Sequence, residues 1–92
     1  MITFNIAGFL TDFTGGRSQI PLDGLPATVG EGLGRLWELH VGLRDRVVNE
    51  KGEVRLHVNI FVNNENIRHQ QALSTPLSEG DEITILPSVS GG

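Results

Sequence analysis

The chain has 92 residues, no cysteine and a formal net charge of −4. This length fits one domain, which buries roughly 60–65% of its unfolded surface and leaves little room for an internal substrate cavity. The missing cysteines exclude disulfides, cysteine metal ligands and a cysteine nucleophile. One lysine and six scattered arginines do not form the cationic cluster that nucleic-acid binding needs.

The partners expected from charge and hydropathy are proteins. The acidic residues are spread along the chain, which favours a partner with a basic surface over nucleic acid. The first residues contain no basic segment followed by an apolar run. No stretch approaches the ~18 apolar residues of a membrane span. We therefore expect a cytoplasmic protein with no membrane partner.

Two strands are predicted near the N-terminus. Apolar residues alternate with polar or small ones over residues 2–6 and again over residues 19–22, the pattern of a strand with one buried face. Pro21 cannot donate to a neighbouring strand, so the second strand belongs at a sheet edge. Residues 9–16 between them, which end in Gly15-Gly16, are expected to form a long loop.

A helix is predicted after Thr28. Thr28 with Glu31 three residues later forms a capping-box pattern, and the three glycines that follow are expected off the apolar face. We expect this helix to end at Gly42. Residues 44–46 are expected to form a short helical turn, and residues 50–52 the tip of a loop. The apolar face at helical spacing comprises Val29, Leu33, Leu36, Trp37 and His40.

The C-terminal half carries two further strands. Residues 58–62 alternate with Val58, Ile60 and Val62 on one face, and residues 83–86 form the last strand, which stops at Pro87. Between them we expect a turn over 63–66, a connector over 67–77 and a tight turn over 79–81. The order strand, strand, helix, strand, strand predicts an α+β fold. We expect a mixed sheet of about four to five strands, with one main helix packed on one face.

No catalytic residue and no metal site is predicted. The three histidines are widely spaced and form no H-E-x-x-H pattern. The acids around Gly80 crowd a single turn, where they are solvated, whereas acid–base catalysis needs carboxylates in differing environments. These side chains, which we interpret as structural or solvated, are His40, His57, His69, Glu79, Asp81 and Glu82.

One surface feature points to a partner. If Val58, Ile60 and Val62 face the core, then Phe61 faces outward, and Leu86 likewise points away from the core residues Ile83 and Ile85. An aromatic ring and a leucine on the uncovered face of a sheet indicate a docking patch. Single exposed apolar residues are common, however.

The last residues carry the chemistry that the rest of the chain lacks. After Pro87 a short spacer leads to Gly91-Gly92. Glycine has no side chain and accepts unusual backbone angles, so such a tail can thread a narrow channel and present its carboxylate in another protein's active site. Adenylation with ATP would convert this carboxylate into a reactive mixed anhydride, which a sulfur donor could attack.

These residues together resemble the ThiS/MoaD sulfur-carrier family, over nearly the whole chain. The likeness is carried by Val58-Asn59-Ile60-Phe61-Val62-Asn63, Ile67-Arg68, Pro76-Leu77, Glu79-Gly80-Asp81-Glu82 and the run from Ile83 to Gly92. Family members usually end in Ala-Gly-Gly, and here Ser90 replaces the alanine.

The resemblance implies a ubiquitin-like β-grasp domain over residues 1–87 and a flexible tail over 88–92. Gly92 would be adenylated and converted to a thiocarboxylate, while Gly91, Ser90 and Val89 thread the partner's channel. The implied partner is an adenylyltransferase similar to ubiquitin-activating enzymes. That partner uses the ATP, so the chain itself is expected to bind no cofactor.

The region 43–53 is longer than in compact thiamine-type carriers and is similar to the carrier branch of thiocarboxylate-dependent cysteine biosynthesis. That branch implies a pyridoxal-phosphate cysteine synthase, which builds a cysteinyl adduct on the tail, and a zinc metalloprotease that releases the amino acid. In each case the chain is a co-substrate and the partners supply the catalysis.

Three other interpretations remain open. The chain could be the small subunit of molybdopterin synthase, whose tail enters a large catalytic subunit. It could be a ubiquitin-like modifier joined to lysines through Gly92. It could also be a β-grasp binding module in which the tail has no role; deleting Gly91 and Gly92 without loss of function would favour this last interpretation.

Overall fold

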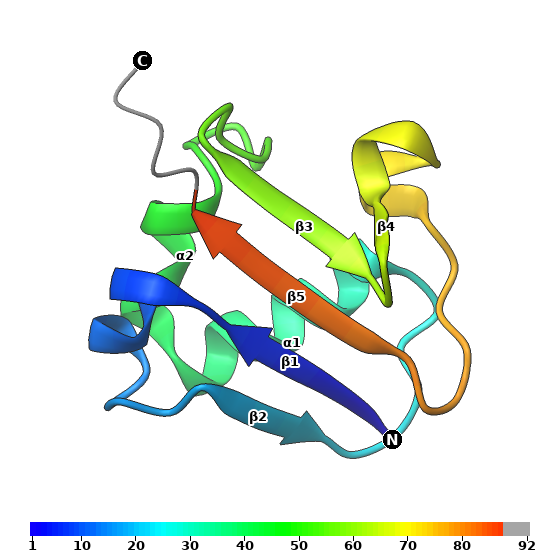
Figure 1. Ribbon diagram of the computed structural model, residues 1–92, viewed down its shortest axis with the longest axis horizontal. Coiled ribbons are helices and arrows are strands. Elements are labelled where there is room, and N and C mark those ends of the chain that lie inside the picture. The colour runs from blue at the N-terminus through cyan, green and yellow to red at the C-terminus, as the bar shows by residue number, and fades with distance from the viewer. Residues whose placement is uncertain (88–92) are drawn as a thin grey trace.

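Two parallel strands, β1 and β5, form the middle of a five-stranded mixed sheet (Figure 1). The computed structural model describes residues 1–87. Along the sheet the strand order is β2-β1-β5-β3-β4, and every other pairing is antiparallel. The strands are β1 (Ile2–Ile6), β2 (Gln19–Leu22), β3 (Val58–Val62), β4 (Glu65–Asn66) and β5 (Glu82–Pro87).

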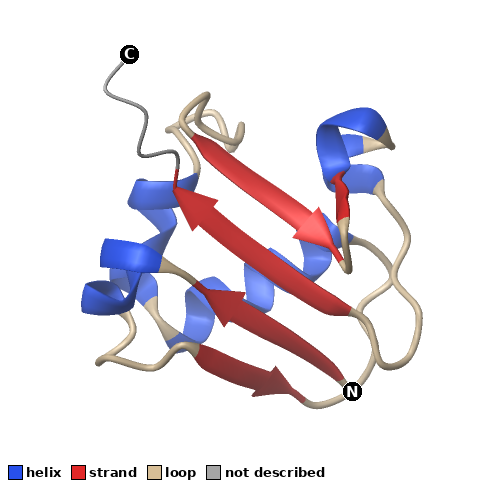
Figure 2. Ribbon diagram, viewed as in Figure 1, coloured by secondary structure: helices blue, strands red, loops and turns tan. Residues whose placement is uncertain are grey.

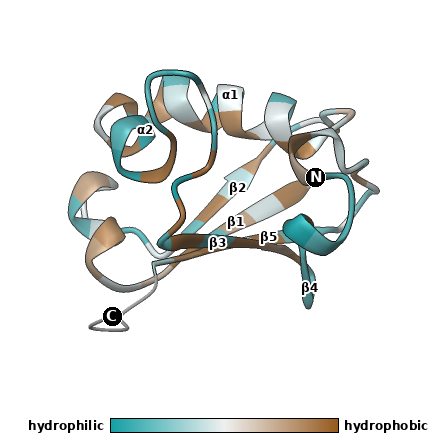
Figure 3. Cartoon of the chain, turned by 90° about the horizontal axis from the view of Figure 1, so that it is seen from above, coloured by the Kyte–Doolittle hydropathy of each residue, from teal (hydrophilic) through white to brown (hydrophobic). Residues whose placement is uncertain are grey.

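The two α-helices lie on one face of this sheet, and a 3₁₀ segment, η1, lies at the end of the sheet beside Pro87 (Figures 2 and 3). The core fills the space between the two layers, and within residues 1–87 no α-helix covers the other face. The predicted α+β class and mixed sheet are confirmed. The helical segments are η1 (Gly8–Phe13), α1 (Val29–Leu39), α2 (Val41–Val47), η2 (Ile67–His69) and η3 (Ala72–Ser74), where η marks a 3₁₀-helix.

The alternating patterns predicted the strands well. In β1 and in β3 the first, third and fifth residues are buried and the others are partly exposed. Because side chains alternate between the two faces of a strand, one set enters the core and the other reaches the open face. Pro21 lies in β2, which is an edge strand as expected.

The first helix begins where the capping pattern placed it. The Glu31 N–H donates to Thr28 Oγ1 at 3.2 Å, and α1 buries Val29, Leu33 and Leu36. The expectation that the glycines lie off this face is wrong for Gly32, which is buried. A Cβ built there would lie 3.5 Å from both Ile2 Cδ1 and Phe4 Cζ, which is an ordinary van der Waals distance, so Gly32 faces β1 across a close but unstrained contact.

The predicted stop at Gly42 is also wrong. The helix α1 ends at Leu39, because His40 adopts φ −137° and ψ 78°, and a second helix, α2, begins at Val41 and contains Gly42. Leu43 and Val47, four residues apart on α2, are both buried. Their shared face explains why the helical turn predicted over residues 44–46 extends to two turns.

The connections hold more structure than the sequence indicated. The segment expected as a loop over 9–16 contains η1, the predicted turn over 63–66 contains the two-residue strand β4, and the connector over 67–77 contains η2 and η3. Thr75, buried after η3, donates from Oγ1 to the Ala72 carbonyl at 2.7 Å and accepts from the Gln71 N–H.

The expected tail, including Val89, Ser90, Gly91 and Gly92, lies outside the described residues. Within residues 1–87 there is no helix with the length and apolar character needed to cross a membrane.

Candidate functional site

The point at which β5 ends fixes where residues 88–92 are attached. Pro87 pairs with Val58, the first residue of β3, and on its other side it meets Gly8 after β1. Gly8 has φ +63°, and a Cβ there would lie 3.2 Å from Pro87 Cγ. The positive φ favours glycine at this position, and a Cβ there would also press on the Pro87 ring. The chain leaves the described domain between the end of β1 and the start of β3.

Phe61 and Leu86 lie on the sheet face that carries no helix. In the β3–β5 register Phe61 is opposite Thr84, and Leu86 is opposite Asn59. The two apolar side chains are thus diagonal neighbours, which long side chains can bridge. Leu86 is 41% exposed and Phe61 is half-buried. The structure places the two predicted patch residues together, and their role as a docking patch stays a prediction.

A network of amide and guanidinium groups borders this pair. Asn59 Oδ1 accepts from Arg68 Nη1 at 2.7 Å and from Asn66 Nδ2 at 3.2 Å. Arg68 Nη2 also donates to the carbonyls of Arg55 and Val58, at 2.9 and 2.8 Å. Arg68 therefore ties η2 to the start of β3, and it holds Asn59 beside Leu86.

The opposite end of the sheet is polar and acidic. Asn5 Nδ2 donates to Glu82 Oε1 at 2.8 Å, and Asn63 Nδ2 donates to Asp81 Oδ1 at 3.1 Å. The N-terminal ammonium group contacts the Glu79 carboxylate. Met1, Glu79, Asp81 and Glu82 lie at the beginnings of β1 and β5, at the end of the sheet farthest from Pro87.

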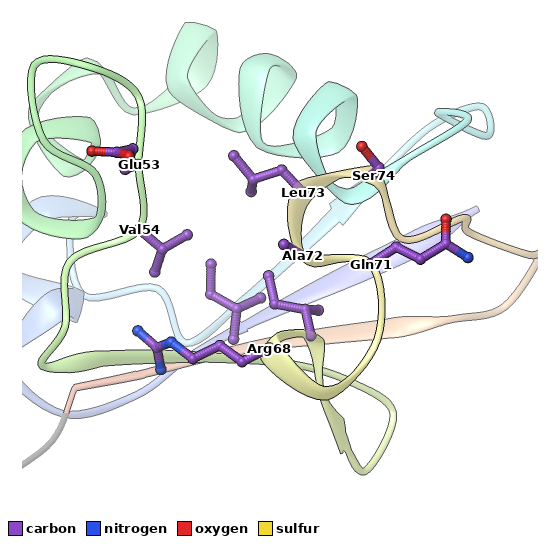
Figure 4. Close-up of a pocket in the computed structure, with 9 residues that line it drawn as sticks. Glu53, Val54, Arg68, Gln71, Ala72, Leu73 and Ser74 are labelled. Carbon is purple, nitrogen blue, oxygen red and sulfur yellow. The ribbon is translucent and has the colours of Figure 1, made fainter.

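A cleft of about 410 Å³ opens on the helix side of β3 (Figure 4). Val54 and Leu73 point into it from two different segments, Arg68 runs along its lower edge, and Glu53 points away. Ile60, on the buried face of β3, also lines it. The cleft lies on the other side of the sheet from Phe61 and is mainly apolar, so it is suited to an apolar side chain.

The three histidines are dispersed. His40 follows α1, His57 is exposed just before β3, and His69 ends η2. Among residues 1–87 there is no group of three or more histidine, aspartate or glutamate side chains that could hold a metal ion.

A family model described as the ThiS family matches residues 5–92 of this chain, including the Gly-Gly end. The chain belongs to the ThiS family.

The relatives cover both carriers and modifiers. The sulfur carrier protein CysO of Mycobacterium tuberculosis (strain ATCC 25618 / H37Rv) is 34% identical over 93 residues, which span 99% of this chain and 98% of the relative. Small archaeal modifier protein 3 of Haloferax volcanii is 39% identical over 66 residues, 72% of this chain and 71% of the relative.

A solved structure, the crystal structure of the Amycolatopsis orientalis BexX/CysO complex, contains a chain that matches this ThiS-family fold with a TM-score of 0.88. That chain is 34% identical, and the match covers 100% of both chains. The expected ubiquitin-like β-grasp fold is confirmed, and one similar protein is described in a complex with another protein.

Two features of the site were not foreseen. The first is the cleft of Figure 4, and the second is Leu56, which lies in the turn before β3 and is 94% exposed. Near these two features, the sequence singles out only the Ile67-Arg68 pair, which contributes to the family likeness. The role of Arg68 depends on the fold, because its guanidinium group donates to the carbonyls of Arg55 and Val58, which lie 13 and 10 residues earlier in the chain.

Proposed function

We propose that this chain is a sulfur carrier that works through the carboxylate of Gly92. The supporting observation is that the ThiS family model extends through residue 92, together with 34% identity to a sulfur carrier protein over nearly the full length of both chains. The described domain supports the proposal because β5 ends at a fixed point, Pro87, from which residues 88–92 continue.

The proposed reaction has two steps. A carboxylate oxygen of Gly92 attacks the α-phosphorus of ATP and displaces pyrophosphate, which leaves an acyl-adenylate. A sulfide-level donor then attacks the carbonyl carbon and displaces AMP, which leaves a thiocarboxylate and releases a proton. Gly91, Ser90 and Val89 would lie in the channel of the enzyme while this occurs, because two glycines need the least width.

The contribution of the described domain is recognition. We assign the patch of Phe61 and Leu86 to the adenylating enzyme. Both side chains lie on the open face of the sheet, and Leu86 is next to Pro87 along the chain. Apolar side chains on an uncovered face lose water when a partner packs on them, and an aromatic ring contributes more than most residues to such an interface.

The later partners follow from the kind of carrier that the chain resembles. A pyridoxal-phosphate cysteine synthase would accept the thiocarboxylate, and a zinc metalloprotease would release the product from the tail. In this scheme the chain is a co-substrate and not an enzyme. The ATP and the other cofactors belong to the partners.

The first experiment is an intact-mass measurement. The chain is incubated with the adenylating enzyme of the same organism, ATP and sulfide. We expect a mass gain equal to the exchange of one oxygen for one sulfur atom, and no gain in a variant that lacks Gly92. An unchanged mass, with the enzyme shown active on another carrier, would contradict the proposal.

A second candidate function is protein modification. It is favoured by the 39% identity to a small archaeal modifier protein. Both functions begin with adenylation of Gly92, but a modifier then forms an isopeptide bond with a lysine. A cell extract that yields tail-to-lysine conjugates in the absence of any sulfide-dependent mass gain would favour this candidate.

A further inference from the structure

Leu56 is the most exposed of the large apolar side chains in residues 1–87. It is 94% exposed, compared with 76% for Val41 and 41% for Leu86. A single exposed leucine is ordinary on a protein surface. What distinguishes Leu56 is how firmly its turn is held and where that turn lies.

The backbone around Leu56 is fixed by hydrogen bonds on both sides. The Val58 N–H donates to the Arg55 carbonyl at 3.0 Å, which closes a turn over residues 55–58, called here the Leu56 turn. The Arg55 N–H donates to the Val47 carbonyl at 2.9 Å, and Arg55 Nε donates to the Asp45 carbonyl at 2.8 Å. These two bonds anchor the turn to the C-terminal end of α2.

Arg68 fastens the other side of the Leu56 turn. Its guanidinium group donates to the carbonyls of both Arg55 and Val58, the first and last residues of the turn. The turn therefore presents an apolar side chain to solvent from a backbone that has little freedom left to lose. Such preorganisation reduces the entropy that an interface must overcome.

The position of the turn connects it with the tail. Val58, which ends the Leu56 turn, pairs with Pro87. Only residues 88–92 separate Pro87 from the carboxylate of Gly92. Five extended residues span at most about 17 Å. An enzyme that takes this carboxylate into an active site below its own surface must therefore bring the rim of its channel against the residues around Pro87.

We propose that the Leu56 turn is a docking element, separate from the patch of Phe61 and Leu86, and that Leu56 packs on an apolar rim at the channel mouth of the adenylating enzyme. This inference rests on the proposed function of Gly92. The adenylating enzyme is the occupant because both the carrier and the modifier schemes require activation of the carboxylate first. In both schemes, residues 88–92 must carry the carboxylate from Pro87 into the active site of this enzyme.

The test compares Leu56→Ser with Val41→Ser in the adenylation reaction. Val41 is similarly exposed, but it begins α2 in the helix layer and is distant in sequence from the paired Val58 and Pro87. Adenylation is followed by ATP–pyrophosphate exchange at varied carrier concentration. We expect Leu56→Ser to lower kcat/KM by about tenfold to a hundredfold, mainly through KM, because the serine loses the free energy of burying a leucine side chain.

Val41→Ser should leave both constants unchanged, and Leu56→Met should restore most of the activity because it keeps an apolar side chain of similar volume. Circular dichroism and the urea midpoint of each variant verify that the domain is folded. If Leu56→Ser matches the wild type, or if Val41→Ser loses as much, the docking role of Leu56 is wrong while the carrier proposal stands. If the wild type itself supports no exchange with an active enzyme, both are wrong.

Discussion

Arg68 replaces strand pairing that β4 is too short to provide. Within residues 1–87, strand β4 pairs only with Phe61 and Val62, so the first half of β3 has no neighbouring strand on that side. Buried or half-buried backbone carbonyls need hydrogen-bond partners, and Arg68 supplies one to Val58. Its planar guanidinium group holds donors on separate nitrogens in a fixed fork and so reaches Asn59 as well as the Arg55 and Val58 carbonyls, whereas a lysine offers its donors from a single nitrogen. One side chain thus both closes a sheet edge and fixes the turn that presents Leu56.

Phe61 allows the proposed docking patch to be tested without disturbing the core. Its ring is half-buried on the open face, opposite Thr84. We expect Phe61→Ala to lower kcat/KM for adenylation of the chain by about tenfold, the effect of removing an aromatic anchor from an interface. The spectrum of the folded domain should not change. The measurement is ATP–pyrophosphate exchange, with circular dichroism on the same samples.

The matched control for Phe61→Ala is Leu39→Ala. Leu39 is 57% exposed at the end of α1, in the helix layer, so its truncation removes apolar surface from a different side of the domain. Equal kcat/KM values for Phe61→Ala and the wild type would refute the docking role of the patch.

At the scale of elements, α1 is held in place by packing rather than by its own propensity. Gly30, Gly32 and Gly34 occupy alternate positions in an eleven-residue helix, and each glycine costs about 1 kcal/mol relative to alanine in a helix interior. A Cβ at Gly32 would make ordinary van der Waals contacts with Ile2 and Phe4 of β1, at 3.5 Å. Gly34 is exposed, and a Cβ there would meet no atom within 4 Å.

We therefore expect Gly34→Ala to raise the free energy of unfolding by about 0.5–1 kcal/mol. Gly30→Ala should raise the free energy of unfolding by less, or lower it, because the new Cβ would lie 3.2 Å from the Leu73 carbonyl oxygen of η3. Urea denaturation of both variants, compared at equal m-values, measures the difference. An equal gain in the two variants would show that η3 yields readily and that the contact with α1 is loose.

The long elements could be predicted because their patterns are periodic, and the short ones could not. The strand β3 follows from strict alternation over Val58–Val62, and the start of α1 follows from Thr28 and Glu31. The break at His40 carries no such signal, since neither glycine nor proline occurs there and tertiary packing of Leu43 and Val47 decides it. The two-residue strand β4 and the 3₁₀ segments are shorter than any usable period.

The residues of the candidate site likewise fall into those that the sequence predicts and those that it does not. The outward position of Phe61 and Leu86 follows from alternation alone, and the tail residues were identified from their likeness to a family. The Leu56 turn and the cleft beside Arg68 could not be predicted. They depend on which backbone carbonyls come within reach of one guanidinium group after the chain has folded. Residues distant in sequence create both features.

At the scale of the whole molecule, stability and chemistry occupy different parts of the chain. Within residues 1–87, the buried apolar side chains extend from Ile2 to Ile85 and come from both sheet and helices. The central strands β1 and β5 run parallel, so the N-terminal residue begins at one end of the sheet and Pro87 lies at the other (Figure 1). Residues 88–92, which carry the carboxylate proposed to react, are thus attached at the end of the sheet opposite to Glu79, Asp81 and Glu82.

This separation predicts that removal of residues 88–92 abolishes adenylation but leaves the fold intact. We expect Tm to change by less than about 2 °C, because the buried core lies within residues 2–85. For comparison, a loss of 1 kcal/mol of stability would lower Tm by roughly 4–8 °C in a domain of this size. Calorimetry of the 1–87 chain and the wild type, at equal concentration and salt, measures the difference. The same truncated chain should still compete with the wild type for the adenylating enzyme, since Phe61, Leu86 and Leu56 are all retained. A fall in Tm of several degrees would instead mean that the tail contributes to the stability of the domain, and an inability to compete would place recognition in residues 88–92 alone.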